Sequence, residues 1–368
     1  MKVLSIVTLV TPHGDYGGPV RVALNQAEEL RARGHDVTVA GAHRGFGGTP
    51  PGDFDGVPAA LFPAKTIVPG AGFAGLASPG LDRWLAGNIR DFDIVHVHAA
   101  RDLVTLPAAR RASKAGIPFV LQTHGMIDPS SHPLAVPLDA LLTRPLLRRA
   151  KQVFYLTPEE RSGLVDVGGE TLALRELPNG VPIPAGRRRE PAVREVLYLA
   201  RLAARKRPMV FVETARRLAR KHPGTRFTLV GPDEGEASRV ERAIAETPSN
   251  ALSWEGPLAP ESTGARMRQA SIYVLPSVDE PFPMSVLEAM SLGLPVVITD
   301  SCGLAPVVRR TGCGIVTDAS QEGMDAAVDR LLDDDALARE MGERGVRAAR
   351  DELSMPAVAD ILESAYSS

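Results

Sequence analysis

Residues 271–299 read SIYVLPSVDEPFPMSVLEAMSLGLPVVIT, which combines a strand, a loop, a helix and a second strand. The apolar runs at 271–275 and 294–299 predict strands that are buried in a parallel sheet. Pro283 suits the first turn of the helix between them, and Gly293 suits its end. Because a loop leads from a strand into a helix N-terminus, where backbone N–H groups are unpaired, the segment predicts an anion-binding site.

Two glutamates make the chemistry of this segment more specific. Glu280 lies on the loop before the helix, and Glu288 lies five residues beyond Pro283, about 7.5 Å along the helix axis. At that distance from a diphosphate at the helix start, Glu288 suits a ribose diol, because a carboxylate accepts two hydroxyl donors. Glu280 would then face the group at the other end of the diphosphate. The alternative is that both acids only complement the positive end of the helix dipole.

The composition is that of a globular protein with two domains. The chain has 368 residues, of which 44% are hydrophobic and 23% charged, and its net charge is -2. This length normally gives two domains, and this charge suggests no nucleic-acid partner. Cys302 and Cys313 are too few for a zinc site, so we expect free thiols. Because neither a secretory signal nor a membrane-spanning segment is recognisable, we expect a soluble, cytoplasmic protein.

The N-terminal part alternates strands and helices. Residues 2–9 predict a buried strand, residues 20–33 an amphipathic helix and residues 36–40 the next strand. Gly17 and Gly18 lie in the loop that follows the first strand, at the sheet edge where ligands approach in parallel α/β folds. They would allow a ligand close to the backbone, although a pair of glycines also fits an ordinary turn.

Three histidines collect where two neighbouring strands are predicted to end. His96 and His98 share one face of the strand at 92–98, and His124 follows the strand at 118–123. His124 is the strongest candidate for a functional role, because the glycine after it lets the backbone turn toward a ligand. A metal triad is an alternative, but no carboxylate lies at ligand spacing, and histidines at strand ends commonly cap backbone groups.

A basic amphipathic helix is predicted over 134–151, with leucines interleaved with arginines. It would suit either an anionic membrane surface or, more ordinarily, packing with a solvated basic face. Thr157 and Glu160 then resemble a capping box that opens another helix. The segment 177–191 breaks every periodicity and predicts the linker between two domains.

A second series of strands and helices follows this linker. Its first loop, at 201–207, reads RLAARKR and carries four cations and no acid. Arg201 and Lys206 leave the carboxyl edge of a strand just before a helix, where cations can neutralise phosphate oxygens. Such runs are more often solvated faces. The predicted position on the same sheet edge as Glu280 favours ligand binding.

The order and spacing of these motifs resemble the retaining glycosyltransferases of family 4, also called group 1 glycosyl transferases. The resemblance covers the whole chain and rests on residues 17–18 with Arg21, 34–37, 124–126, 178–181, Arg201 with Lys206, Glu280 with 288–290, and 293–297. It implies an α/β GT-B fold, in which two Rossmann-like domains face each other across a cleft. Residues 1–182 would form the acceptor domain, 183–350 the nucleotide-sugar domain, and 351–368 a helix that packs back on the first domain.

The resemblance also implies a role for each site residue. Arg201 and Lys206 would bind the donor diphosphate, and Glu288 the ribose. Glu280 would bind hydroxyls of the transferred sugar, and His124 would lie near the reacting carbon. His124, Glu280, Arg201 and Lys206 would form the catalytic set. The remaining contacts with the donor would come from Gly17, Gly18, Phe282, Met284 and Ser285.

The implied reaction transfers a sugar from a nucleotide diphosphate, UDP rather than GDP, to a hydroxyl acceptor in the interdomain cleft. Cations and a helix N-terminus would neutralise the diphosphate, so we expect neither a metal nor another cofactor. The acidic run at 333–335 is interpreted as surface. The acceptor would be a polysaccharide, a lipid-linked sugar or a small natural product, with weak peripheral membrane contact as an option.

Two other functions fit the same motifs. A nucleotide-sugar epimerase of this fold would convert the donor without an acceptor. A catalytically silent nucleotide-sugar binding module would result if Pro281 and Pro283 spoil placement of the sugar, because the family usually has glycines in this loop and proline offers no N–H.

Overall fold

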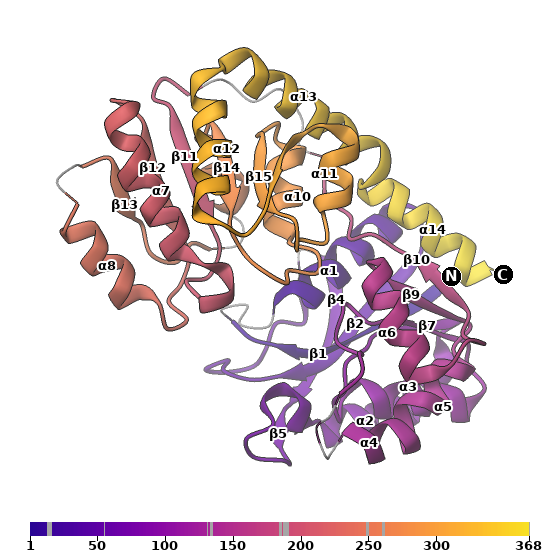
Figure 1. Cartoon of the computed structure of the whole chain (residues 1–368). Coiled ribbons are helices and arrows are strands. Elements are labelled where there is room, and N and C mark those ends of the chain that lie inside the picture. Colours follow the sequence, from indigo (N-terminus) through magenta and orange to yellow (C-terminus); the bar gives the residue numbers. More distant parts are fainter. Residues whose placement is uncertain are drawn as a thin grey trace. The chain divides into compact units, whose positions relative to one another are not determined.

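The structure is a computed structural model that describes residues 1–12, 17–54, 56–130, 132, 135–183, 186, 191–247, 250–259 and 262–367. The chain divides into two compact units (Figure 1). Unit 1 comprises Met1–Gly180 and Met355–Ser368, and unit 2 comprises Val181–Ser354. The division therefore falls two residues before the boundary expected at 182. The C-terminal segment, expected over 351–368, belongs to unit 1 from Met355 onward.

Unit 1 is built on a sheet with the strand order β10-β9-β8-β7-β1-β2-β4-β3. Its neighbouring strands are parallel, apart from the β3–β4 pair. The strands are β1 (Lys2–Val10), β2 (Asp36–His43), β3 (Asp53–Phe54), β4 (Val57–Pro63), β7 (Ile94–His98), β8 (Phe119–Gln122), β9 (Gln152–Tyr155) and β10 (Leu174–Glu176). Because β1 lies between β2 and β7 and is buried on both faces, its apolar run shows no alternation.

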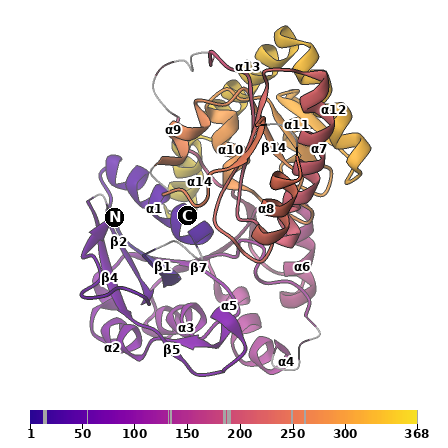
Figure 2. The same ribbon diagram turned by 90° about the vertical axis from the view of Figure 1, so that its left-hand side faces the viewer.

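Helices cover both faces of this sheet. On one face α1 (Gly17–Ala32) packs beside the C-terminal helix α14 (Met355–Ser367), as Figure 2 shows. Arg33, just after α1, binds Asp360 and Glu363 of α14 at 2.6 and 2.8 Å. The opposite face is covered by α2 (Pro79–Asn88), α3 (Thr105–Ala115), α5 (Arg144–Arg149) and α6 (Pro158–Gly168).

The helix predicted over 134–151 is interrupted. α4 (Ala135–Leu138) runs into a π-helical turn, η3 (Asp139–Thr143), before α5 begins. Pro145 has no N–H with which to continue the α-helical hydrogen bonding, and this explains the irregular turn before it. Leu134 lies outside the described residues. The remaining short elements of unit 1 are β5 (Lys65–Thr66), η1 (Gly72–Gly75), β6 (Leu76–Ala77) and η2 (Ile89–Asp91).

Unit 2 contains a parallel sheet with the order β13-β12-β11-β14-β15-β16. The strands are β11 (Glu195–Leu199), β12 (Arg226–Val230), β13 (Leu252–Trp254), β14 (Ile272–Leu275), β15 (Val296–Thr299) and β16 (Gly314–Thr317). The helices are η4 (Ala204–Lys206), α7 (Pro208–Lys221), α8 (Ala237–Ala245), α9 (Thr263–Met267), α10 (Met284–Ser291), α11 (Ala305–Thr311), α12 (Gln321–Asp333) and α13 (Asp335–Glu352).

The strand order of unit 2 reverses between β11 and β14, because the chain adds β12 and β13 on one side and β15 and β16 on the other. Ligands of open parallel sheets bind at such a switch point, outside the carboxyl ends of the strands. The loop at 201–207 follows β11, and the loop that carries Glu280 follows β14. The topology therefore brings the two loops with predicted site residues to neighbouring strand ends.

Candidate active site

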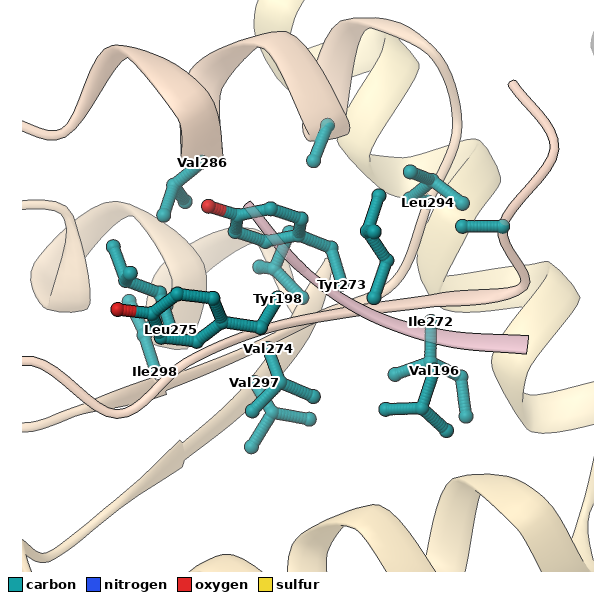
Figure 3. Close-up of a cluster of buried hydrophobic side chains, with 14 of the residues drawn as sticks. Val196, Tyr198, Ile272, Tyr273, Val274, Leu275, Val286, Leu294, Val297 and Ile298 are labelled. Atoms are coloured by element: carbon teal, nitrogen blue, oxygen red, sulfur yellow. The ribbon is translucent and has the colours of Figure 1, made fainter. Parts of the chain in front are cut away.

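Two buried tyrosines lie in β11 and β14, the two strands at the switch point. Tyr198 of β11 and Tyr273 of β14 are fully buried, and in the view of Figure 3 both hydroxyls point to the same side. The Tyr198 hydroxyl donates to the Arg201 carbonyl at 3.0 Å, and the Tyr273 hydroxyl contacts Ser285 Oγ at 2.7 Å. Burial, the largest cause, raises both tyrosine pKa values above the ordinary range. Both phenols therefore stay neutral and tie the first loop and the start of α10 to the sheet.

Lys206 and Glu280 form a buried ion pair at this sheet edge. Lys206 Nζ lies 2.5 Å from Glu280 Oε2, and the two side chains are only 11% and 10% exposed. Arg205 lies 3.6 Å from the same carboxylate oxygen. Burial lowers the pKa of Lys206, and the nearby Glu280 carboxylate opposes that shift. The pair brings together two of the four residues with a predicted catalytic role.

Strained turns place this pair. Arg207 adopts a left-handed backbone with φ of 52°, and it directly follows the short η4 turn that carries Lys206. Asp279, just before Glu280, is also left-handed with φ of 50°. Such conformations are uncommon for residues other than glycine and need support from their surroundings. Here the Glu280 backbone pairs with Cys302 in an isolated bridge, and its carbonyl accepts from Gly303 N at 2.8 Å.

Arg201 lies at the same edge but in a different environment. Its guanidinium is 2.5 Å from Glu234, and the two side chains are 45% and 47% exposed. Exposed ion pairs contribute only about 0–1 kcal/mol, so this partner can be exchanged for a phosphate at little cost. The Arg201 guanidinium is therefore accessible for binding an anionic ligand.

The start of α10 differs from the sequence prediction in one detail. Pro283 is the N-cap, with an extended backbone at φ of -72° and ψ of 115°, so it precedes the first helical turn instead of lying in it. Met284 and Ser285 open the helix, and Glu288 is half-buried one turn further on. Phe282 is also half-buried and packs against the core of unit 2. Because proline donates no hydrogen bond, the N–H groups of the next residues are the ones available to an anion.

The first glycine pair is placed differently from the prediction. α1 begins at Gly17, so Gly17 and Gly18 belong to its first turn and not to the preceding loop. A Cβ at Gly18 would meet no heavy atom within 4 Å. The loop residues 13–16 lie outside the described part of the chain. As predicted, the glycine pair follows the carboxyl end of β1 in the chain.

In unit 1 the three predicted histidines form a stack. The ring centroids of His96 and His98 are 4.6 Å apart, and those of His98 and His124 are 5.1 Å apart, with interplanar angles of 6° and 12°. His98 Nδ1 and His124 Nε2 share a hydrogen bond of 2.9 Å, and His96 Nδ1 bonds the Tyr366 hydroxyl at 2.7 Å. Stacked rings do not converge on one point, so this arrangement does not support the alternative of a metal triad.

Burial keeps all three imidazoles neutral. It lowers the pKa of His96 and of His124 to about 3, and it lowers the pKa of His98 as well. The buried Nε2 of His98 has no partner among the described residues. A bare nitrogen is less costly there than an orphaned N–H, so His98 donates through Nδ1 to His124 Nε2. The proton of His124 then resides on Nδ1, which makes that atom a hydrogen-bond donor.

The Glu160 side chain holds the loop around His124, which the capping-box pattern did not predict. Its carboxylate accepts from Thr123 Oγ1 and Gly125 N, each at 2.5 Å, and from Leu156 N at 2.6 Å. It thus holds both neighbours of His124, whose own backbone is left-handed with φ of 52°. The predicted capping box is only half formed. Thr157 does cap α6 by accepting from Glu160 N, but the glutamate side chain binds the histidine loop instead.

The acidic run at 333–335 joins α12 to α13. Lys221 Nζ lies 2.7 Å from Asp329 and 2.8 Å from Asp333, and His222 Nε2 lies 2.7 Å from Asp329. Among the described residues, one group of three His, Cys, Asp or Glu side chains has ligand atoms close enough together to hold a metal ion. It consists of His222, Asp329 and Asp333. Because the Lys221 ammonium already bridges the two carboxylates, we interpret the group as an ion-pair cluster.

The basic segment around α5 is largely committed to its own unit. Arg144 and Arg148 donate to the carbonyls of Val167 and Gly168, each at 2.8 Å. Leu141 on the same segment nevertheless remains 75% exposed. Within the described part of the chain, no helix is both long and apolar enough to cross a bilayer.

Comparison with known proteins identifies the family of the chain. It matches the family model "Glycosyl transferases group 1" over residues 186–348 and the model "Glycosyl transferase 4-like domain" over residues 17–180. The chain belongs to the group 1 glycosyltransferases. The two matched regions of this glycosyltransferase end and begin near the division between its two units, which have the architecture of the GT-B fold.

Among curated relatives of this glycosyltransferase, glycogen synthase of Mycobacterium tuberculosis is 29% identical over 71% of the chain and 64% of its own length. The match thus spans less than two thirds of that relative. D-inositol 3-phosphate glycosyltransferase of Corynebacterium diphtheriae is 25% identical over 96% of the chain and 90% of its own length. Among solved structures, Anabaena HepE in complex with UDP and glucose is 18% identical to this chain. The match covers 100% of each of the two chains, with a TM-score of 0.77.

Proposed function

We propose that the protein is a retaining glycosyltransferase that moves a sugar from a nucleotide diphosphate to a hydroxyl acceptor without a metal. The observation that carries this proposal is the buried Lys206–Glu280 pair at the switch point of unit 2. A lysine buried beside a carboxylate, at the carboxyl edge of a parallel sheet, is placed for a ligand that brings both phosphate oxygens and hydroxyl groups.

The charges around this pair suit a diphosphate leaving group. Lys206 has three N–H donors, and one of them is used by Glu280. The others can bind the diphosphate oxygens, where negative charge develops as the bond to the sugar breaks. Arg205 and Arg201 add two further cations from the same loop. This supply of positive charge is the reason for proposing that no metal takes part.

Glu280 and Glu288 would read the two ends of the donor. Glu280 keeps lone pairs that Lys206 does not use, and they can accept from hydroxyls of the transferred sugar. Glu288, further along α10, would accept from the ribose diol. UDP is the proposed nucleotide because the similarly folded HepE binds UDP, and retention is proposed from the family of the chain.

His124 would act as a hydrogen-bonding group and not as an acid or base. An imidazole whose pKa is about 3 is uncharged at neutral pH, so it cannot supply a positive charge to the transition state. A fixed Nδ1–H donor near the reacting carbon can orient a sugar hydroxyl instead. The Glu160 contacts and the partner His98 would hold that donor in place.

The test is a donor panel. Purified protein is incubated with UDP-, GDP- and ADP-sugars, with and without candidate acceptors, and release of the nucleoside diphosphate is followed in the presence and absence of EDTA. Acceptor-dependent release that is unaffected by EDTA supports the proposal, and the anomeric proton coupling of the product reports retention. Conversion of the donor without an acceptor would indicate an epimerase. Binding without turnover would indicate a silent module.

A further inference from the structure

A groove lies at the amino-terminal edge of the unit 2 sheet, opposite the edge that carries Lys206 and Glu280. It has a volume of about 1000 Å³ and is lined by the start of β14, the end of α10 and one side of α13. Ile272 of β14 faces it, whereas the Glu280 loop follows the other end of the same strand. A strand of this length spans about 13 Å at about 3.3 Å per residue, so the groove is distinct from the candidate donor site.

Arginines dominate the charged lining of this groove. Arg347 and Arg350 come from α13, and Arg268 comes from the turn before β14. Among the described residues, no ion pair within 4.0 Å is found for any of these three side chains. Arg194 also lines the groove, but it is held by Asp335 at 2.6 Å.

Among the described residues of the lining, the opposing charge is small. Glu343 and Asp335 are the two carboxylates there, and Asp335 already binds Arg194. Arg347 and Arg350 are three residues apart on one helix, which places their Cβ atoms about 5–6 Å from each other. Like charges at that spacing repel, and an anion between them would remove the repulsion.

Apart from Arg339, the rest of the lining is apolar or small. Ile272, Leu292 and Val346 line the groove together with the arginines. A groove with a few charged groups over an apolar floor is typical of small-molecule sites, and its volume is in their range. Guanidinium groups match the oxygens of phosphate in a two-pronged geometry that other cations lack.

We propose that this groove is a second ligand site that binds a phosphate monoester through Arg268, Arg347 and Arg350. The phosphate group would lie between the α13 arginines and Arg268, and the organic part would lie on the apolar floor. A soluble sugar phosphate and the phosphate headgroup of a lipid share this chemistry.

The experiment compares two double variants of equal charge. Arg347→Gln/Arg350→Gln changes the groove, and Arg220→Gln/Arg242→Gln removes the same charge from exposed sites on α7 and α8. Both leave the donor loop intact, so phosphate bound there affects them equally. Calorimetric titration with ribose 5-phosphate and with inorganic phosphate measures the soluble ligand, and co-sedimentation with phosphatidic acid vesicles measures the lipid headgroup.

We expect wild type and the control to bind one of these probes alike and the groove variant to bind it at least about tenfold more weakly, because two charge-assisted hydrogen bonds are lost. Glu343→Gln should tighten binding, since it removes the opposing carboxylate. Without phosphate the groove variant should be at least as stable as wild type, which also shows that it folds. Equal binding of all probes by both double variants, or no binding of any probe by wild type, would overturn the proposal.

Discussion

Removing the Lys206 charge should damage both the fold and donor binding. Lys206→Met leaves the Glu280 carboxylate buried, with only Arg205 at 3.6 Å as a remaining cation. Breaking a buried ion pair at one partner typically costs about 3–5 kcal/mol. Because Arg205 compensates part of the charge and both side chains are about one tenth exposed, we expect the lower end, about 3 kcal/mol. Donor affinity should fall about 10- to 100-fold, since one or two charge-assisted hydrogen bonds are lost.

The assay is a double-mutant cycle. Free energies of unfolding are measured by denaturant titration for wild type, Lys206→Met, Glu280→Gln and the double variant, and donor affinity is measured by calorimetry. The double variant should be less destabilised than the sum of the single changes by about 1–3 kcal/mol, because it leaves no uncompensated charge. Lys221→Met is the matched control, since it removes a solvent-exposed lysine. Additive stability effects together with unchanged donor affinity for Lys206→Met would refute the reasoning.

Three further predictions concern unit 1. His124→Ala should keep most donor affinity and lose turnover, and kinetics that separate binding from kcat decide this. Glu160→Gln should lower kcat, and it should lower the free energy of unfolding by roughly 1–3 kcal/mol, because a buried hydrogen-bond acceptor is weakened. Glu159→Gln, which changes the exposed neighbouring residue, should alter neither quantity. The folded-state pKa values of His96 and His124 are about 3, below the ordinary 6.5, so the unfolded chain binds more protons between these values. Stability should therefore fall as pH drops below 6.5, by up to about 1.4 kcal/mol per pH unit for each histidine; denaturant titrations at neutral and mildly acidic pH that agree would contradict it.

Local patterns identified most elements that carry the site. The strand, loop and helix of residues 271–299 appear as β14, a loop and α10, because apolar runs and punctuating residues act over a few positions. The same patterns misplaced the start of α1 and of α10 by one to three residues. Helix ends depend on capping contacts that periodicity does not register.

Other features needed the folded chain. The Glu160 side chain could have been expected at a helix start. Its contacts with both neighbours of His124 could not, because those partners lie in the loop after β8, 35 to 37 residues earlier in the chain. The groove at the other edge of unit 2 likewise joins α13 to the turn before β14. Such sets are separated in sequence by distances that no local pattern spans.

By itself, then, the sequence determined which residue types stand at the strand ends: a lysine and arginines after one strand, a glutamate after another, and a histidine before a glycine. Only the tertiary structure decided that Lys206 and Glu280, 74 residues apart, form one buried pair. The physical reason is that this contact depends on sheet register and on two left-handed turns, at Arg207 and Asp279, that are stable only when the surrounding chain holds them.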